Sequence, residues 1–276
     1  MKIITDTAAL YSPQEGKELG IEIIPACTLV DGQVYRDYED ISAEEILKLI
    51  NQGKNPTSSQ PAIGDVMDIF EGAQEDILCL VIGDGLSGTY QSAMGARNCM
   101  EQKERIHIID TKTLAGAQRY LVEKAIKLKK EGMSIEKIVS KVSSSVETSA
   151  SFVIPVDFNF LKRSGRLTPI AAAITSVIKL VPVLTQTEDM KRIKPFVIKR
   201  SHSKAVDSVI KHFKGMGVNQ EYFVSICHAG VRNVAEDVEK QIRDYFPETT
   251  IEIFQLSPAL IAHGGPGSIT IQAIRK

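Results

Sequence analysis

Several residue types are scarce or missing in this chain of 276 residues. It has no tryptophan and only 6% aromatic residues, so the hydrophobic 43% of the chain is mainly aliphatic. Neither sign of charge is in excess, because 33 basic residues face 34 acidic ones and leave a formal net charge of −1. This balance gives no reason to expect nucleic acid as a partner. The overall composition is that of a globular protein and excludes a disordered chain, a fibre and a disulfide-stapled miniature.

Patterns of metal ligands and reactive cysteines are also missing. The four cysteines lie far apart and form no C-x-x-C pair, which excludes the usual zinc and redox motifs. Cys79 and Cys227 lie inside apolar runs and are expected to be small core residues. The five histidines and the dispersed acidic residues show no metal-ligand spacing. The sequence therefore implies neither a metal nor a cofactor.

No hydrophobic run is long enough to cross a bilayer. The longest apolar stretch, residues 169–184, is interrupted by Thr175, Ser176 and Lys179. The first residues show no charged segment followed by an apolar one, as a secretory signal would. We expect a cytoplasmic protein with no membrane insertion.

Short aliphatic runs alternate with helical patterns, which is typical of an α/β protein. In the first part of the chain, a capping box at residues 42–45 opens one helix, and apolar positions from Leu114 to Leu128 define another. The expected strands are residues 3–4, 77–82, 106–109 and 152–154. This part is predicted to form a mostly parallel, doubly wound sheet.

In the second part, several segments alternate apolar and polar residues with a period of two, as in the segment that begins at Ile251. The expected strands are residues 193–198, 222–227, 251–256 and 268–274. We place a boundary near residue 157, giving an N-terminal α/β domain over 1–157 and a C-terminal, mixed α/β domain over 158–276. A cleft between two α/β domains is the simplest architecture.

A glycine-rich segment, residues 83–88, follows a strong strand and precedes a helical pattern. Gly83, Gly85 and Gly88 have the G-x-G-x-x-G spacing, and Asp110 ends the next strand. These are elements of a dinucleotide fingerprint, so a nucleotide- or NAD-dependent enzyme is one interpretation. A helix N-terminus with glycines also suits any phosphate or carboxylate, and a tight turn alone is a third explanation. Thr89 adds a hydroxyl that a dinucleotide loop does not require.

Two further polar segments lie in irregular sequence. Residues 56–61 hold four side chains with hydrogen-bond donors between two prolines, although such loops are commonly surface turns. His263 lies beside glycines and a proline, where a ligand could approach the backbone, although a single histidine is commonly structural. A hydrolase centred on Ser87 and His263 is weakly supported, because residues 85–89 do not read G-x-S-x-G.

A basic stretch covers residues 191–204 and contains no acidic residue after Lys191. Residues 161–166 add three more cations. Such runs are commonly solvated faces, and the alternative is a site that faces an acidic partner or a phosphoryl group.

Taken together, five motifs resemble those of the DegV family of bacterial fatty-acid-binding proteins. They are T-D-T at residues 5–7, T-S-S-Q-P at 57–61, L-S-G-T-Y-Q-S-A at 86–93, L-K-R-S-G-R at 161–166 and H-G-G-P-G at 263–267. The sequence departs from the family at Ser58, which replaces a threonine, at Ser164, which replaces a glycine, and at residues 7–9, where the family has S-T-A.

The resemblance implies two α/β domains with a long-chain fatty acid in a tunnel between them. Ser58 and Ser87 would bind the carboxylate with the start of the helix after Gly88, including Thr89, and His263 would lie near the head group. Burying a charged carboxylate requires such aligned donors. One group of aliphatic residues is a candidate for the tunnel lining, and the same pattern also fits an ordinary core: Ala171, Ala172, Ala173, Ile174, Val177, Ile178 and Val181.

The resemblance also implies a carrier without catalytic activity of its own. Family members present the fatty acid to a separate kinase that makes an acyl phosphate, and Arg200 would face the phosphoryl group.

Overall fold

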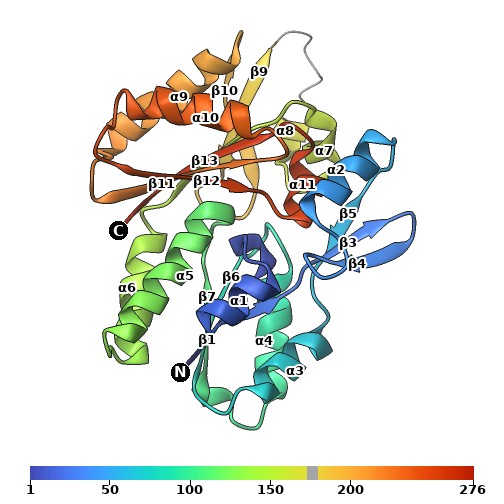
Figure 1. Cartoon of the computed structure of the whole chain (residues 1–276), viewed down its shortest axis with the longest axis vertical. Coiled ribbons are helices and arrows are strands. Elements are labelled where there is room, and N and C mark those ends of the chain that lie inside the picture. The colour runs from blue at the N-terminus through green and yellow to red at the C-terminus, as the bar shows by residue number, and fades with distance from the viewer. Residues whose placement is uncertain (173–179) are drawn as a thin grey trace.

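The aliphatic runs form the strands of three sheets in the computed structural model, which describes residues 1–172 and 180–276 (Figure 1). The first sheet is parallel, in the order β2-β1-β6-β7. Its strands are β1 (Lys2–Asp6), β2 (Glu22–Ile24), β6 (Ile77–Val81) and β7 (Ile106–Asp110). All five residues of β6 are buried, as expected for a central parallel strand covered on both faces.

Helices cover both faces of the first sheet. On one face, Ile4 and Cys79 pack against α3 (Ile63–Gly72) and α4 (Thr89–Cys99). On the other face, Ile3 and Leu80 pack against α5 (Ala115–Lys130) and α6 (Ile135–Val146). The remaining elements of this part are η1 (Thr7–Ala9), α1 (Pro13–Leu19) and η2 (Lys103–Arg105). The predicted doubly wound, parallel arrangement is confirmed.

The second sheet has six strands in the order β10-β9-β8-β13-β11-β12. β11 and β12 are parallel and the other neighbours are antiparallel, so the sheet is mixed as expected. Its strands are β8 (Ala150–Ile154), β9 (Val181–Gln186), β10 (Ile193–Lys199), β11 (Tyr222–His228), β12 (Thr250–Gln255) and β13 (Ile269–Arg275). Its outer face is covered by α9 (His202–Met216) and α10 (Arg232–Arg243).

The expected boundary at residue 157 follows β8, but β8 pairs with β9 and β13 in the second sheet rather than with the first. The local pattern of a buried strand cannot show which sheet that strand joins. The division into domains at residue 157 stays a prediction.

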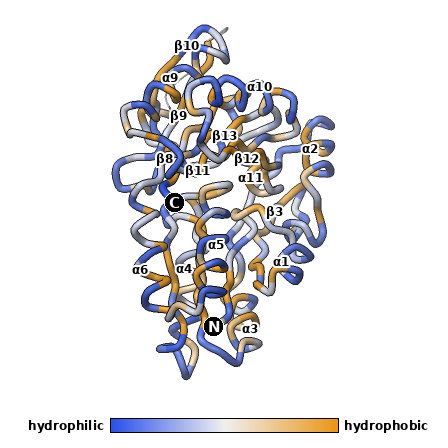
Figure 2. The backbone as a smooth tube through the Cα atoms, turned by 60° about the vertical axis from the view of Figure 1, so that its left-hand side comes forward, coloured by the Kyte–Doolittle hydropathy of each residue, from blue (hydrophilic) through white to orange (hydrophobic). Residues whose placement is uncertain are grey.

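Helix α5 lies between the first and second sheets (Figure 1). Tyr120 stacks on Phe223 of β11 with ring centroids 5.1 Å apart. Gly116 permits the close approach, because a Cβ at this position would lie 2.3 Å from the Ser225 side chain. In Figure 2, apolar segments follow the inner strands, while hydrophilic segments lie mainly at outer loops and helix ends.

A third, small sheet was not predicted. It is antiparallel, in the order β4-β3-β5, and contains β3 (Cys27–Val30), β4 (Gln33–Arg36) and β5 (Thr57–Ser59). Helix α2 (Ala43–Asn51) connects β4 to β5, and α11 (Pro258–Gly264) contacts β3 and β5. Helices α7 (Phe158–Ser164) and α8 (Pro169–Ala172) lie beside the second sheet. The capping box of α2 is confirmed, since the Ser42 hydroxyl accepts from Glu45 N and Glu45 accepts from Ser42 N.

Candidate functional site

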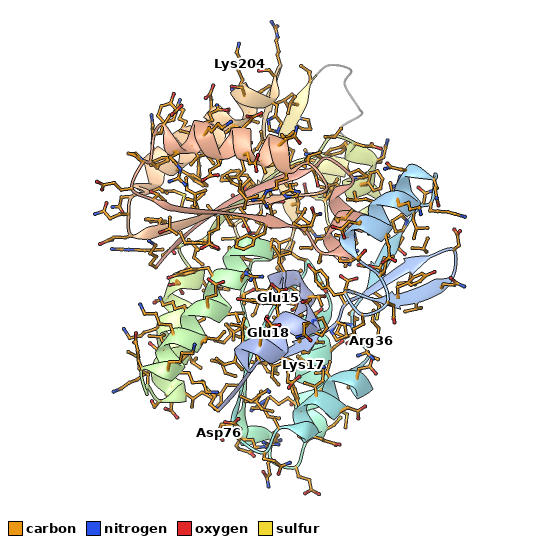
Figure 3. The ribbon with its side chains drawn as sticks, viewed as in Figure 1. Glu15, Lys17, Glu18, Arg36, Asp76 and Lys204 are labelled. Carbon is orange, nitrogen blue, oxygen red and sulfur yellow. The ribbon has the colours of Figure 1, made fainter. Side chains whose placement is uncertain are left out.

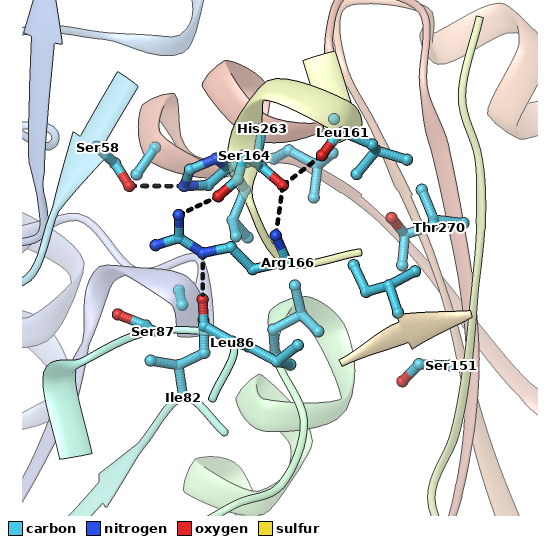
Figure 4. Close-up of a pocket in the computed structure, with 18 of the residues that line it drawn as sticks. Ser58, Ile82, Leu86, Ser87, Ser151, Leu161, Ser164, Arg166, His263 and Thr270 are labelled. Carbon is cyan, nitrogen blue, oxygen red and sulfur yellow. Dashed lines mark hydrogen bonds between the residues drawn. The ribbon is translucent and has the colours of Figure 1, made fainter. Parts of the chain in front are cut away.

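A cavity of about 120 Å³ lies where the three sheets approach one another. Its walls come from the loop after β6, from β8 and β9 of the second sheet, and from β5 and α11 (Figure 4). Much of the wall is aliphatic: Leu86, Leu114, Val153, Leu161, Leu184 and Ile193. Ser58, Ser87, Arg166 and His263 gather at one side of the cavity, and the opposite wall mixes aliphatic side chains with the uncharged Ser151 and Thr270 (Figure 4). The cavity therefore suits a molecule with one charged end and a largely apolar body.

Ser58 and His263 meet in the cavity wall although 205 residues separate them in sequence. Ser58 Oγ lies 2.6 Å from His263 Nε2, within hydrogen-bond distance (Figure 4). β5 presents the serine and α11 presents the histidine. Desolvation, and after it the charge of Arg166, lowers the pKa of His263 to about 3. The imidazole is therefore neutral at physiological pH.

Ser87 and Thr89 line the same cavity at the start of α4. The Ser87 hydroxyl lies 2.9 Å from Thr89 Oγ1 and accepts from Thr89 N at 3.3 Å. The beginning of this loop is held by Asp6, whose carboxylate accepts from Ile82 N at 2.7 Å. The loop thus places hydroxyls beside the N-terminus of an 11-residue helix, where a negative charge is stabilised.

Gly88 lets the segment after β5 pack directly on α4. A Cβ at this position would lie 1.5 Å from Gln60 Oε1. The Gln60 amide donates to Ser92 Oγ at 3.0 Å, and Ser92 donates to Pro61 O at 2.8 Å. These contacts hold the segment that carries Ser58 against the helix that begins beside Ser87.

Arg166 was not predicted as a site residue, since in sequence it is one of several nearby cations. Its Nε donates to Leu86 O at 3.0 Å, its Nη1 donates to Ser164 O, and its guanidinium lies between His263 and Ser87 (Figure 4). Within residues 1–172 and 180–276, Arg166 has no salt bridge to a carboxylate. Burial lowers the pKa of Arg166 from its ordinary value. A partly buried cation without an acidic partner favours an anionic ligand.

The glycines of the expected dinucleotide loop contact other parts of the chain. A Cβ at Gly83 would lie 3.0 Å from the Lys112 backbone, and a Cβ at Gly85 would lie 2.8 Å from Lys191. Asp110 accepts from the backbone N–H groups of Asp84 and Lys112. Contacts within the protein therefore explain why glycine occurs at positions 83 and 85 and which groups Asp110 binds, so neither feature requires a nucleotide.

The serine–histidine pair differs from the one that a Ser87-centred hydrolase would need. His263 contacts Ser58, whereas Ser87 contacts Thr89. In the described part of the chain, no carboxylate hydrogen-bonds to His263. The geometry therefore gives Ser87 no general base.

Arg200 lies just after β10, is exposed, and does not line the cavity. The rest of the basic stretch extends from the β9–β10 turn to α9, where Lys204 points outward at the far end of the molecule (Figure 3). Lys191 and Lys194 pair with Asp84 and Glu188 respectively. The stretch is thus partly neutralised by acids from other segments.

The segment expected to line a tunnel is only partly described. Ala173, Ile174, Val177 and Ile178 lie outside the described residues. Ala171 is buried against Phe158 and Leu184, and Val181 begins β9.

None of the helices in the described ranges is both long and apolar enough to span a membrane. Among those same residues, no group of three or more His, Cys, Asp or Glu side chains could hold a metal ion.

Comparison with known proteins gives matches over the whole chain. The model of the DegV family, described as uncharacterised proteins, matches residues 1–276. A DegV domain-containing protein of Caldanaerobacter subterraneus subsp. tengcongensis is 29% identical over 268 residues, which cover 96% of this chain and 95% of that protein.

Two solved structures are also similar. The fatty acid binding DegV family protein of Streptococcus agalactiae is 26% identical with a TM-score of 0.86, covering 100% of this chain and 98% of the other. A DegV family protein of Eubacterium eligens loaded with heptadecanoic acid has a TM-score of 0.88 at 18% identity, and the match covers 100% of both chains.

Proposed function

The chain belongs to the DegV family, and on this premise we propose that it is a carrier that binds a long-chain fatty acid and presents it to a partner kinase. The observation that carries the proposal is the cavity, which joins aliphatic walls to a polar end containing an unpaired cation. The fatty-acid ligands of similar solved structures support the same ligand class.

The polar end matches what a carboxylate requires. Ser58, Ser87 and Thr89 line the cavity and offer hydroxyl donors at the start of α4. Gly88 caps this helix but does not line the cavity, because Gln60 packs against it. His263 is neutral and can donate one N–H, while Arg166 supplies the positive charge. Several such donors offset the cost of removing a carboxylate from water.

The aliphatic wall supplies affinity for the acyl chain. At ~0.8 kcal/mol per buried methylene, a long tail offers on the order of ten kcal/mol before the costs of ordering are subtracted. Phe152 is the one phenylalanine, tyrosine or tryptophan among the described residues that line the cavity, and its ring packs edge-on against Phe196 and Phe213. A nucleotide enzyme remains the alternative, and calorimetry with NAD and ATP should give no heat for either if the carrier proposal holds.

Replacing Ser87 tests the carboxylate site. We expect Ser87→Ala to weaken binding of palmitate by about 10- to 100-fold, because a hydrogen bond to a charged group is lost. Equilibrium binding of labelled palmitate measures the change, and Ser144→Ala, on the exposed side of α6, is the matched control. Unchanged affinity in Ser87→Ala would remove this residue from the site.

The kinase step concerns the surface rather than the cavity. Arg200 is exposed at the end of β10, where an external enzyme can reach it. We expect Arg200→Glu to bind palmitate as the wild type does but to slow phosphorylation of the bound acid by a fatty acid kinase. The measurement is the rate of acyl-phosphate formation with saturated carrier, and an unchanged rate would exclude Arg200 from that step.

A further inference from the structure

A buried carboxyl group links the two elements that carry Ser58 and His263. Asp37 follows β4 and is fully buried. One of its oxygens accepts from Thr28 Oγ1 at 2.7 Å, and the other accepts from Ala259 N at 2.9 Å. Asp37 itself does not line the cavity.

Both hydrogen-bond partners lie next to a cavity residue. Thr28 of β3 is directly opposite Ser58 of β5 in the antiparallel register. Ala259 lies in α11 four residues before His263, which is about one helical turn. The two oxygens of Asp37 thus join the strand beside Ser58 to the helix that presents His263.

We propose that Asp37 is a positioning residue for the carboxylate site, which sets the separation of Ser58 and His263 through Thr28 and Ala259. The proposal rests on the proposed function, because it assigns to this link the geometry that holds a fatty-acid carboxylate. With His263 Nε2–H donating to Ser58 Oγ across 2.6 Å, the serine hydroxyl is free to donate to a ligand oxygen, so this separation sets where the hydroxyl points.

The chemistry of the link requires a carboxyl group of this length. Asparagine has one acceptor oxygen and no negative charge, so the charge-assisted bonds to Thr28 and Ala259 are replaced by weaker neutral ones. Burial raises the pKa of Asp37 to about 7, and no Lys or Arg within the described ranges forms a salt bridge with it. The titratable groups that act on it or feel its charge are Asp6, Cys27 and Tyr38. Burying a carboxyl group without a neighbouring cation costs free energy. We attribute the presence of Asp37 to the geometry that it imposes on the site.

Asp40 of the same turn provides a matched control. Its carboxylate accepts from Arg36 N at 2.7 Å, but it is exposed and reaches neither β3 nor α11. Asp37→Asn and Asp40→Asn therefore make the same chemical change in one turn, and only the first weakens the link.

The test compares equilibrium binding of labelled palmitate with that of labelled 1-hexadecanol, which has the same chain without a carboxylate. We expect Asp37→Asn to raise the Kd for palmitate about 10-fold and the Kd for hexadecanol less than about 2-fold. Asp40→Asn should change neither. Equal weakening of both ligands would show that Asp37 supports only the fold, and no weakening would exclude any role.

A double-mutant cycle tests whether Asp37 acts through the histidine. In the His263→Ala background, Asp37→Asn should change the Kd for palmitate by less than about 2-fold. Additive effects would overturn the proposal.

Variants at Thr28 keep the test decisive if Asp37→Asn does not fold. Thr28→Val removes the hydroxyl donor and should weaken palmitate binding selectively, whereas Thr28→Ser keeps the donor and should restore it. If Thr28→Val binds palmitate like the wild type, the link is not needed. A wild-type protein that binds palmitate no better than hexadecanol would instead overturn the proposed carboxylate site.

Discussion

The charge of the cavity depends on three residues that line it, Arg166, His263 and Asp6. Arg166 provides a cation, and desolvation, followed by the charge of Arg166, lowers the pKa of His263 and keeps it neutral. A bound carboxylate would balance the arginine, while the neutral imidazole donates a hydrogen bond. Asp6 directs its carboxylate oxygens to the backbone N–H groups of Ala8 and Ile82, so among the described residues Arg166 is the group of the cavity that supplies positive charge to an anion.

The low pKa of His263 makes a prediction about stability. The folded-state pKa is about 3 and the ordinary value is 6.5, so between these values the unfolded chain binds more protons than the folded one. The contribution of His263 to the free energy of unfolding is fully present above about pH 6.5. It decreases as the pH falls towards 3, by up to about 1.4 kcal/mol per pH unit. Urea unfolding of the ligand-free wild type and of His263→Gln at several pH values measures this contribution as the difference between their free energies of unfolding.

We expect the free energy of unfolding of the wild type to fall relative to that of His263→Gln as the pH is lowered from 6.5. Burial raises the pKa of Asp6 to about 6 and that of Asp37 to about 7, which acts in the opposite direction. Both carboxyl groups are present in wild type and variant, so their contributions cancel in the difference. Parallel curves for the two proteins would contradict a neutral His263.

The sequence predicted some site residues and missed others for physical reasons. Ser58, Ser87 and His263 were predicted because their motifs resemble those of a known family; the structure places them in the wall of one cavity, and their part in binding stays a prediction. Arg166 was missed because nothing in a run of cations tells which one lacks an acidic partner in the fold. Asp37 was missed because its role depends on contacts with residues 28 and 259.

At the scale of elements, prediction succeeded where local pattern decides the outcome. The aliphatic runs became strands, and the capping box at Ser42 opened α2. The small third sheet was missed because its strands are only three or four residues long and carry polar side chains. The sheet membership of β8 was not predictable, since pairing with β13 is a contact between distant segments.

At the scale of the whole molecule, the cavity exists because elements from both parts of the chain meet at one place. The loop after β6 supplies Ser87, β5 supplies Ser58, and α11 near the C-terminus supplies His263. Helix α5 fixes the two large sheets relative to each other through Gly116 and Tyr120. The scarcity of aromatic residues suits this arrangement, because aliphatic side chains adapt to a flexible acyl chain.

Native mass spectrometry of the freshly purified protein tests the central claim most directly. The account predicts a bound species whose mass, after extraction and identification, is that of a C14–C18 fatty acid. Protein stripped of lipid should regain that mass when palmitate is added, and 1-hexadecanol should compete poorly. A chain that purifies without lipid and takes up no palmitate would contradict the account.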